Sequence, residues 1–374
     1  MLLDKLRSIL PLNNQNYPID FQKIIKNLYS SSEPDEEKVL FIWDAYCFSQ
    51  NAHAGQKRHS GKPYFTHCAS VGVTLSEWKM DSKTIAAGLL HDVIEDTETS
   101  QDDMVNKFGE EVTELVNGVS NLSGIKFSSR MEKQAENFMK MFLSVAKDLR
   151  VIIIKFADRL HNMHTIEHLP LIKQRRIAIE TRDVYAPLAH RLGMNQLKTE
   201  LEDMVLKTLE PDEYQAIHKK IMATRKQREK YIDEFTKPIN AELSEFKIQA
   251  KIKGRAKHYF SILGKMRKRN KKFEELFDLF AIRAVVEKIE ECYAVLGVIH
   301  QLYTPLQERF KDYIATPKSN GYQSIHTTVF GKNGKMVEVQ IRTIEMDQTA
   351  EIGVAAHWVY KEKGAFKAGD TDIN

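Results

Sequence analysis

HTTVFGKNGKMVEVQIRT, residues 326–343, carries the clearest strand signal in the chain. Apolar and polar side chains alternate on both sides of Asn333-Gly334, and an Asn-Gly pair between two alternating segments is the strongest short-range signal for a β-hairpin. A compact apolar run of strand length, LFDLFAIRAVV at 276–286, predicts a further strand. The C-terminal third of the chain is therefore predicted to be α+β, with a small mixed sheet.

The first 200 residues show the period of helices instead. KTIAAGLLHDVIEDT, at 83–97, places Ile85, Leu89 and Val93 at helical spacing, which predicts a helix through this whole segment. Charged amphipathic helices are expected from about 170 to 245. Loops are expected at the polar interruptions 59–63, 97–103 and 123–133, the last of them mobile. The N-terminal half is thus predicted to be all-α.

The composition excludes several classes of protein. Lys and Arg total 55 against 51 Asp and Glu in 374 residues, so the net charge of +4 argues against a histone-like or tail-type nucleic-acid binder. No run approaches about 18 consecutive apolar residues, the length of a membrane span. The three cysteines, Cys47, Cys68 and Cys292, form no CxxC pair and no disulfide framework. We therefore expect a cytoplasmic protein without contact to a membrane.

Histidine and acidic residues gather in the N-terminal half, where seven of the thirteen histidines lie between 53 and 168. The residues that stand out as ligands are His67, His91, Asp92 and Asp158. Imidazole and carboxylate groups together suit a divalent ion such as Mn²⁺, Fe²⁺ or Zn²⁺. Glu95 and Asp96 follow one helical turn later and could orient a water whose pKa the metal lowers. The set suits phosphoester hydrolysis, although a His-Asp pair also occurs in packed helices without any metal.

A strongly basic segment precedes the predicted strand at 276–286. Residues 247–272 carry eleven Lys or Arg and no acidic residue. Asp278 then begins the apolar run, and a carboxylate beside a dense basic field is the arrangement expected for Mg²⁺ with a polyphosphate. A solvated helical face or a general RNA-binding patch would produce the same basic run.

Three polar residues share one face of the last predicted strand. Glu338, Gln340 and Arg342 alternate with apolar residues, so their side chains point to the same side. Such groups are costly to bury without a ligand or hydrogen-bond partners, which favours a binding site on this face. A sheet with one solvated face would show the same alternation.

The segments AHAGQKRHSGKPYFTH, LLHDVIEDT and KFADRLHNM resemble the successive motifs of the hydrolase domain of RelA/SpoT-type alarmone enzymes, a branch of the HD phosphohydrolases. The resemblance implies a Mn²⁺ site formed by His67, His91, Asp92 and Asp158. It also implies that Glu95 and Asp96 act on the attacking water, and that Arg58 and Asn162 contact the substrate. Family members usually carry Arg at the position of His164, which is not a metal ligand.

GRAKHYFSILGKM, LFDLFAIR, RFKDYIATPKSNGYQSIHTTV and VEVQIRT resemble the pyrophosphokinase domain of the same family. The resemblance implies that Asp278 binds Mg²⁺, that Glu338 is the base for the acceptor ribose hydroxyl, and that Tyr322 stacks on guanine. The residues implied at the ATP phosphates are Arg255, Lys257, His258, Lys265 and Arg267. Those implied to complete the acceptor pocket are Lys318, Asn320, His326, Gln340 and Arg342.

The two resemblances together imply a bifunctional (p)ppGpp synthetase and hydrolase of the stringent response. Such an enzyme transfers pyrophosphate from ATP to the 3′-hydroxyl of GDP or GTP, and it hydrolyses (p)ppGpp back to GDP or GTP. The basic motif RFKD, at 309–312, is typical of the bifunctional members. The expected domains are an all-α HD-type hydrolase domain (1–195, with shared linker helices at 135–195), an α+β nucleotidyltransferase-like synthetase domain (196–365) and a tail (366–374).

Simultaneous operation of both reactions would only consume ATP, so the two sites are expected to be antagonistic. Two alternatives stay open: an HD phosphohydrolase whose second domain only senses nucleotide, and an RNA- or ribosome-binding module that uses residues 247–272. Asp278 and Glu338 argue against the RNA-binding module, because carboxylates repel phosphate unless a metal intervenes. The expected partners are ATP, GDP or GTP and (p)ppGpp, without direct nucleic-acid readout. Ribosome and tRNA contacts are expected only through the regulatory domains that commonly follow the synthetase domain in this family.

Overall fold

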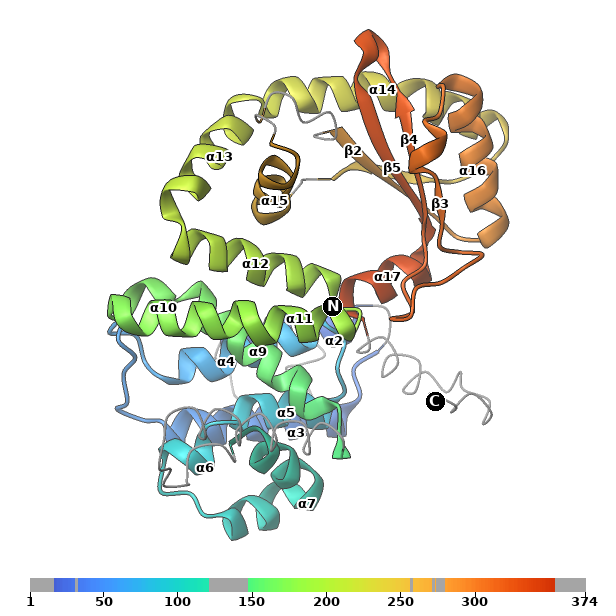
Figure 1. The fold of residues 1–374 in the computed structure, drawn as a ribbon. Helices are drawn as coiled ribbons and strands as arrows, with labels where there is room; N and C mark the ends of the chain where they lie inside the picture. The colour runs from blue at the N-terminus through green and yellow to red at the C-terminus, as the bar shows by residue number, and fades with distance from the viewer. Residues whose placement is uncertain are drawn as a thin grey trace. The chain divides into compact units, whose positions relative to one another are not determined.

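The polypeptide divides into two compact units between Pro170 and Leu171, inside the segment predicted to hold shared linker helices. The computed structural model describes residues 17–30, 33–120, 147–255, 258–270, 273 and 280–353 (Figure 1). The predicted mobile loop at 123–133, Lys257 and Asp278 lie outside the described residues.

The described part of unit 1 is helical, as predicted. Its elements are α2 (Ile19–Leu28), α3 (Glu36–Ala52), α4 (Phe65–Glu77), α5 (Ser82–Leu90), α6 (Val93–Asp96), α7 (Gln101–Ser120), α9 (Arg150–His164) and the 3₁₀ turn η1 (Ile166–His168). The carboxylates of Asp35 and Asp81 accept hydrogen bonds from backbone N–H groups in the first turns of α3 and α5, which fixes where these helices begin. α4 packs against α2, α5 and α9, so the helix that carries His67 lies at the centre of the unit.

The single helix predicted over 83–97 is wrong, because the chain turns at His91 and Asp92. α5 ends at Leu90, and α6 begins at Val93 and makes only one turn. Asp92 has φ −100° and ψ −3°, which departs from the regular helical values near −63° and −42°. The hydroxyl of Ser120 donates to the carbonyl oxygen of His91 at 3.0 Å, so a contact with α7 satisfies a backbone group where the helix is interrupted.

Unit 2 begins with helices and continues into a sheet. The first helices are α10 (Leu171–Glu180), the π-helical turn η2 (Thr181–Tyr185), α11 (Ala186–Arg191), α12 (Asn195–Leu209), α13 (Pro211–Ala223) and α14 (Arg225–Glu245). The strands are β1 (Lys251–Gly254), β2 (Phe280–Val286), β3 (Lys311–Asp312), β4 (Ile325–Phe330) and β5 (Met336–Thr343). The remaining elements are α15 (Tyr259–Arg269), α16 (Ile289–Leu302), α17 (Ile344–Ile352) and the 3₁₀ turns η4 (Gln307–Arg309) and η5 (Lys332–Gly334).

The five strands form one mixed sheet in the order β1-β2-β5-β4-β3. β5 pairs in parallel with β2 and antiparallel with β4, so it lies in the middle of the sheet. The predicted hairpin is confirmed, with Phe330 opposite Met336 and both Asn333 and Gly334 at positive φ in the connection. The predicted fold class, an all-α domain followed by an α+β domain with a small mixed sheet, is confirmed as well.

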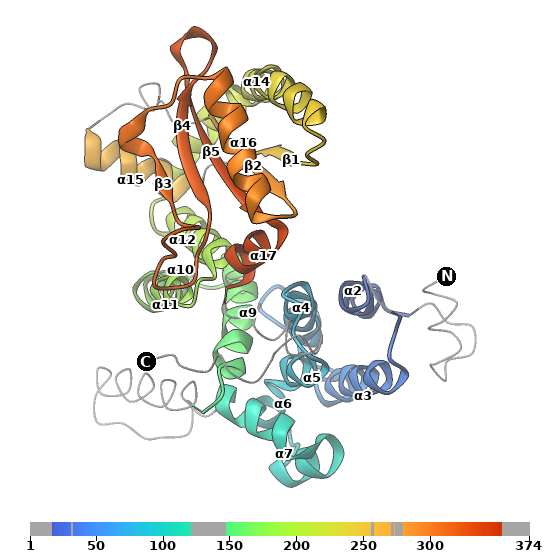
Figure 2. The same cartoon turned by 90° about the vertical axis from the view of Figure 1, so that its right-hand side faces the viewer.

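One face of the sheet carries the apolar core of unit 2. Val337, Val339 and Ile341 of β5 are fully buried in a cluster with residues of α14 and α16, which cover that face (Figure 2). α15 lies on the opposite side of the sheet from α16 (Figure 1). The alternation of a strand therefore directs the other residues of β5 toward the side of α15.

Within the described ranges, no helix combines the length and the apolar character that crossing a bilayer requires.

Gly353, which ends α17, provides a test of the packing in unit 2. It has φ 56°, and a Cβ placed there would lie 2.3 Å from the carbonyl oxygen of Leu192 in the turn before α12. Gly334 also has positive φ, at 68°, but nothing lies within 4 Å of its Cβ position. We expect Gly334→Ala to lower the free energy of unfolding by about 1–2 kcal/mol, the cost of the left-handed backbone. Gly353→Ala should lower the free energy of unfolding by about 1–3 kcal/mol more than Gly334→Ala, because the added Cβ would meet backbone atoms that cannot move aside.

Urea unfolding and hydrogen exchange of α17 measure this difference. Equal losses in the two variants would contradict the close packing of α17 against the turn before α12.

Candidate functional site

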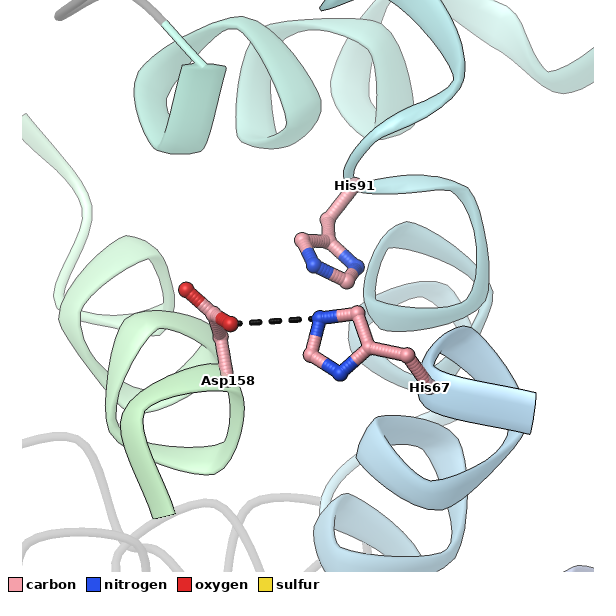
Figure 3. Close-up of side chains that lie close together, drawn as sticks. All are labelled: His67, His91 and Asp158. Carbon is pink, nitrogen blue, oxygen red and sulfur yellow. Dashed lines mark ion pairs between the residues drawn. The ribbon is translucent and has the colours of Figure 1, made fainter. Parts of the chain in front are cut away.

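Three of the predicted metal ligands converge in unit 1 from three different helices. His67 comes from α4, His91 from the end of α5 and Asp158 from α9, and the three side chains point toward one another (Figure 3). Their ligand atoms all lie within 4.8 Å of one another, and His67 Nε2 is 3.2 Å from Asp158 Oδ1. Both imidazoles are buried, with exposed fractions of 2% and 1%. The structure thus forms a candidate metal site from these three residues.

Asp92 adds a second carboxylate to this site. Its Oδ2 lies 3.1 Å from His91 Nε2 and 3.6 Å from His67 Nε2. Cys68 also has its sulfur near His91 and Asp92, which gives an alternative set of ligands. Burial and then the charge of Asp92 raise the pKa of the Cys68 thiol well above its usual range, so the thiol stays protonated. We therefore favour the two imidazoles with the two carboxylates.

The chemistry of these donors fits a divalent cation. His91 Nδ1 lies 2.8 Å from the carbonyl oxygen of Gly88 and must donate to it, since a carbonyl only accepts. The other nitrogen, Nε2, is buried without an aligned hydrogen-bond partner, although Asp92 Oδ2 is 3.1 Å away. A buried imidazole nitrogen that faces carboxylates is expected where a positive charge, a proton or a metal ion, lies between them.

The charges of the cluster agree with this assignment. Burial lowers the pKa of His91, but the carboxylates of Asp92 and Asp158 outweigh it and raise that pKa to about 9. Burial raises the pKa of Asp92, yet the neighbouring His91 brings it down to about 2. The pKa of Asp158 is likewise below its usual range, because its hydrogen bond to His67 outweighs burial. Both carboxylates are thus ionised at neutral pH and attract positive charge into the site.

Tyr64 links the candidate metal site to one of the predicted water-activating acids. Its hydroxyl lies 2.8 Å from Asp92 Oδ2 and 2.7 Å from Asp96 Oδ2, and it can donate to only one of them at a time. Glu95 and Asp96 both lie exposed on α6. Sequence reasoning missed Tyr64, although it comes three residues before His67. It also missed Lys155, a buried lysine of α9 whose pKa burial lowers.

The predicted substrate-binding residues Arg58 and Asn162 contact each other. Arg58 Nη2 donates to Asn162 Oδ1 at 2.7 Å, and Asn162 Nδ2 donates to Asp158 Oδ1 at 2.5 Å. His161, which sequence reasoning did not single out, has its Nδ1 2.8 Å from His67 Nδ1. Its place in α9 one turn after Asp158 was the available signal. These contacts surround the candidate metal site on the side of α9.

In unit 2, most of the predicted nucleotide-binding residues line one cavity of about 500 Å³. They are Arg255, His258, Lys318, Asn320, Tyr322, His326, Gln340 and Arg342. Glu338 lies beside the cavity, where its Oε1 accepts a hydrogen bond from Gln340 at 3.1 Å and is 3.8 Å from Arg255 Nη1. A larger cavity of about 1070 Å³ shares Arg255, Arg283 and Glu351 with it and extends along β1 and β2 to α14.

Two predicted phosphate-binding residues of α15 do not line this cavity. Arg267 forms an ion pair with Glu210, at the end of α12. Lys265 is not among the described residues that line the cavity. His258, directly before α15, does line the cavity, and its Nδ1 lies 3.2 Å from Asp203 Oδ2 of α12. Asp203 Oδ1 accepts a hydrogen bond from the N–H of Phe260, so this carboxylate holds the start of α15.

Aromatic and basic side chains meet on one wall of the cavity. The hydroxyl of Tyr322 lies 2.8 Å from His326 Nε2, and Lys318 Nζ lies 5.0 Å from the centre of the Tyr322 ring. Burial lowers the pKa of His326 to about 4, so this imidazole is neutral at pH 7 and shares a hydrogen bond with the Tyr322 hydroxyl. The Tyr322 ring therefore has a partner at its hydroxyl and a cation near its face.

Two acids on α17, which sequence reasoning missed, hold arginines of this cavity. Arg342 is only 2% exposed, and burial lowers its pKa. Its Nε donates to Asp347 Oδ1 at 2.6 Å. Arg283 Nη1 lies 3.1 Å from the same oxygen and 3.1 Å from Glu351 Oε1. Buried guanidinium groups need such partners, and α17 supplies them directly after β5.

Known proteins match both units. The family model of the HD domain matches residues 45–195, and the model of the region found in RelA / SpoT proteins matches residues 254–365. The chain is 48% identical over 329 residues to the bifunctional (p)ppGpp synthase/hydrolase SpoT of Escherichia coli K12, which is 88% of this chain and 47% of that protein. It is 45% identical over 346 residues to a GTP pyrophosphokinase of Myxococcus xanthus, which is 92% of this chain and 46% of that protein.

The chain spans about half the length of the curated relatives it matches. The HD match contains the four predicted metal ligands, and the RelA / SpoT match contains Arg255 and Glu338. Both matches agree with the order of the helical unit and the mixed-sheet unit. The chain therefore belongs to the RelA/SpoT family, with an HD domain followed by the region found in RelA and SpoT proteins.

Proposed function

We propose that this protein is a bifunctional (p)ppGpp synthetase and hydrolase of the stringent response, acting in the cytoplasm. The observation that carries the proposal is the presence of two different polar sites in one chain. One is the cluster of histidines and carboxylates in unit 1, and the other is the cation-lined cavity beside Glu338 in unit 2. Relatives named for synthesis and for hydrolysis of the same nucleotides support both assignments.

The hydrolase domain of this proposal comprises residues 1–195, the synthetase domain residues 196–365 and the tail residues 366–374. Helices between 135 and 195 serve as a linker that both domains share. The substrates are ATP, GDP or GTP, and (p)ppGpp.

The hydrolase site would hold Mn²⁺ through His67, His91, Asp92 and Asp158. When bound, the ion supplies Lewis acidity to a phosphoryl oxygen and lowers the pKa of water. Glu95 and Asp96 orient the attacking water and take up its proton. The fixed fork of donors on Arg58 suits a pyrophosphate group. Asn162 hydrogen-bonds both to Arg58 and to Asp158, and so connects substrate binding to the ligand cluster.

Removal of the metal tests this site. Thorough chelation should abolish (p)ppGpp hydrolysis, and Mn²⁺ should restore it. His91→Ala should lose both hydrolysis and Mn²⁺ binding, because it removes one of the two imidazole ligands. His168→Ala is the matched control, since His168 is an exposed histidine of η1. Hydrolysis that survives chelation would show that the reaction does not need a metal.

The synthetase site would transfer a pyrophosphoryl group from ATP to the 3′-hydroxyl of GDP or GTP, with AMP as the leaving group. Glu338 accepts the proton of the acceptor hydroxyl, and its hydrogen bond with Gln340 fixes its orientation. Asp278 would hold Mg²⁺, and Arg255, Lys257, His258, Lys265 and Arg267 would bind the ATP phosphates. Tyr322 would stack on guanine. Such a transfer is accelerated mainly by positioning and by neutralisation of charge, which explains the excess of cations.

Glu338→Gln separates the two activities. The amide keeps the shape of the side chain but cannot act as a base, so ppGpp formation from ATP and GDP should fall by about 100-fold or more. Hydrolysis should not change. Glu345→Gln, an exposed position on α17, is the matched control for loss of one negative charge. Nucleotide products are measured in both directions. If the unmodified chain makes no ppGpp, unit 2 only senses nucleotide.

Antagonism between the two sites follows from the opposite directions of their reactions. Saturating GDP together with an inert ATP analogue should slow (p)ppGpp hydrolysis by about 5-fold or more, which is the lower range of allosteric coupling. The same concentrations of CDP with the analogue serve as the control, because CDP lacks guanine. An unchanged rate of hydrolysis would show that the sites work independently.

A further inference from the structure

We propose that His161 is a positioning residue of the candidate metal site, because it determines which ring nitrogen of His67 carries the proton. The inference rests on the proposed metal-dependent hydrolase site. It deepens that site by adding a residue outside the expected ligands, water-activating acids and substrate contacts. His161 lies on α9, one turn after Asp158, and it is partly buried.

Hydrogen-bond donors and acceptors around His161 favour one assignment of protons when a cation occupies the site. The guanidinium of Arg58 has donors only, and its Nη1 lies 3.4 Å from His161 Nδ1. The contact favours an unprotonated Nδ1 on His161, which can accept a hydrogen bond. The same nitrogen lies 2.8 Å from His67 Nδ1, a distance at which the two nitrogens share one proton. A cation bound at His67 Nε2 requires the ring proton on Nδ1, from which His67 then donates to His161 Nδ1.

His67 Nε2 is directed at the carboxylates of the site. His67 Nε2 lies 3.2 Å from Asp158 Oδ1 and 3.6 Å from Asp92 Oδ2. His91 shows the same division of roles, since its Nδ1 contacts the carbonyl oxygen of Gly88. Each imidazole thus has Nδ1 held by a partner and Nε2 available to a cation. For His91 the partner is backbone, but for His67 it is a side chain that a mutation can change.

The contacts close into a ring of five side chains. Arg58 contacts His161, His161 contacts His67, and His67 contacts Asp158. Asp158 accepts from Asn162, and Asn162 accepts from Arg58. Arg58 can only donate, so it also fixes the amide of Asn162 with its oxygen toward Arg58 and its nitrogen toward Asp158. One guanidinium therefore orients a ligand on α4 and a ligand on α9 at the same time.

Mn²⁺ affinity of the purified full chain tests the role of His161. Partners that orient metal-binding histidines typically contribute about 10- to 100-fold to metal affinity. We expect His161→Leu to weaken Mn²⁺ binding by about 10-fold or more, measured by titration calorimetry. His161→Asn should stay within about 3-fold of the unmodified chain, because its Oδ1 can replace Nδ1 as the acceptor. His168→Ala controls for loss of a histidine.

Equal Mn²⁺ affinity of His161→Leu and the unmodified chain would overturn the inference. If the unmodified chain binds no Mn²⁺, the proposed metal site fails and this inference fails with it. The two failures are therefore distinguishable.

A measurement on the unmodified chain covers the case in which His161→Leu does not fold. With ¹⁵N-labelled histidine, NMR should detect a scalar coupling between two imidazole nitrogens across their hydrogen bond, with the proton bonded to His67. His67→Gln, which removes one partner of the pair, assigns the signal. A proton bonded to His161 Nδ1, or the absence of the coupling, would overturn the assignment.

Discussion

The ionised carboxylate of Asp158, only partly exposed to water, is the constraint on which unit 1 depends. An ionised carboxylate is costly to remove from water unless partners compensate its charge. Here the compensation comes from His67 on α4, 3.2 Å away, and from the amide of Asn162 on α9. Three helices must therefore meet at this point, and α5 must end before His91 so that its ring reaches the same place. The excess of negative charge that remains is what makes the cluster suitable for a cation.

The sheet of unit 2 also holds charged groups that need partners, but here the charges are positive. β5 places apolar side chains against α14 and α16, so its polar residues must emerge on the opposite face. Arg342 is buried there and is matched by Asp347 of α17. Arg283 of the neighbouring strand shares the same carboxylate. Cations outnumber acids among the residues that line the cavity, where Arg255 and Lys318 join the two arginines and Glu351 is the acid, and this suits a ligand rich in phosphate.

In both units, side chains without a predicted role position the predicted site residues. Tyr64 connects Asp92 with Asp96, and His161 holds His67. Asp347 does the same for Arg342 in unit 2. A reactive group must be held in one orientation to act efficiently, and partners of this kind supply that orientation. The geometry of each site therefore depends on the hydrogen-bonding partners around it as well as on the ligands themselves.

Residue type and motif resemblance pointed to the candidate ligands, and the amino-acid sequence by itself determined the helical first half and the hairpin around Asn333-Gly334. These depend on periodicity and spacing within a few residues, which local backbone geometry enforces. Only the tertiary structure decided the interruption at His91 and Asp92 and the partners of each site residue. Arg58 and Asn162, for example, are separated by 104 positions. No local pattern records such a contact, because it exists only once packing has brought α9 against the segment before α4.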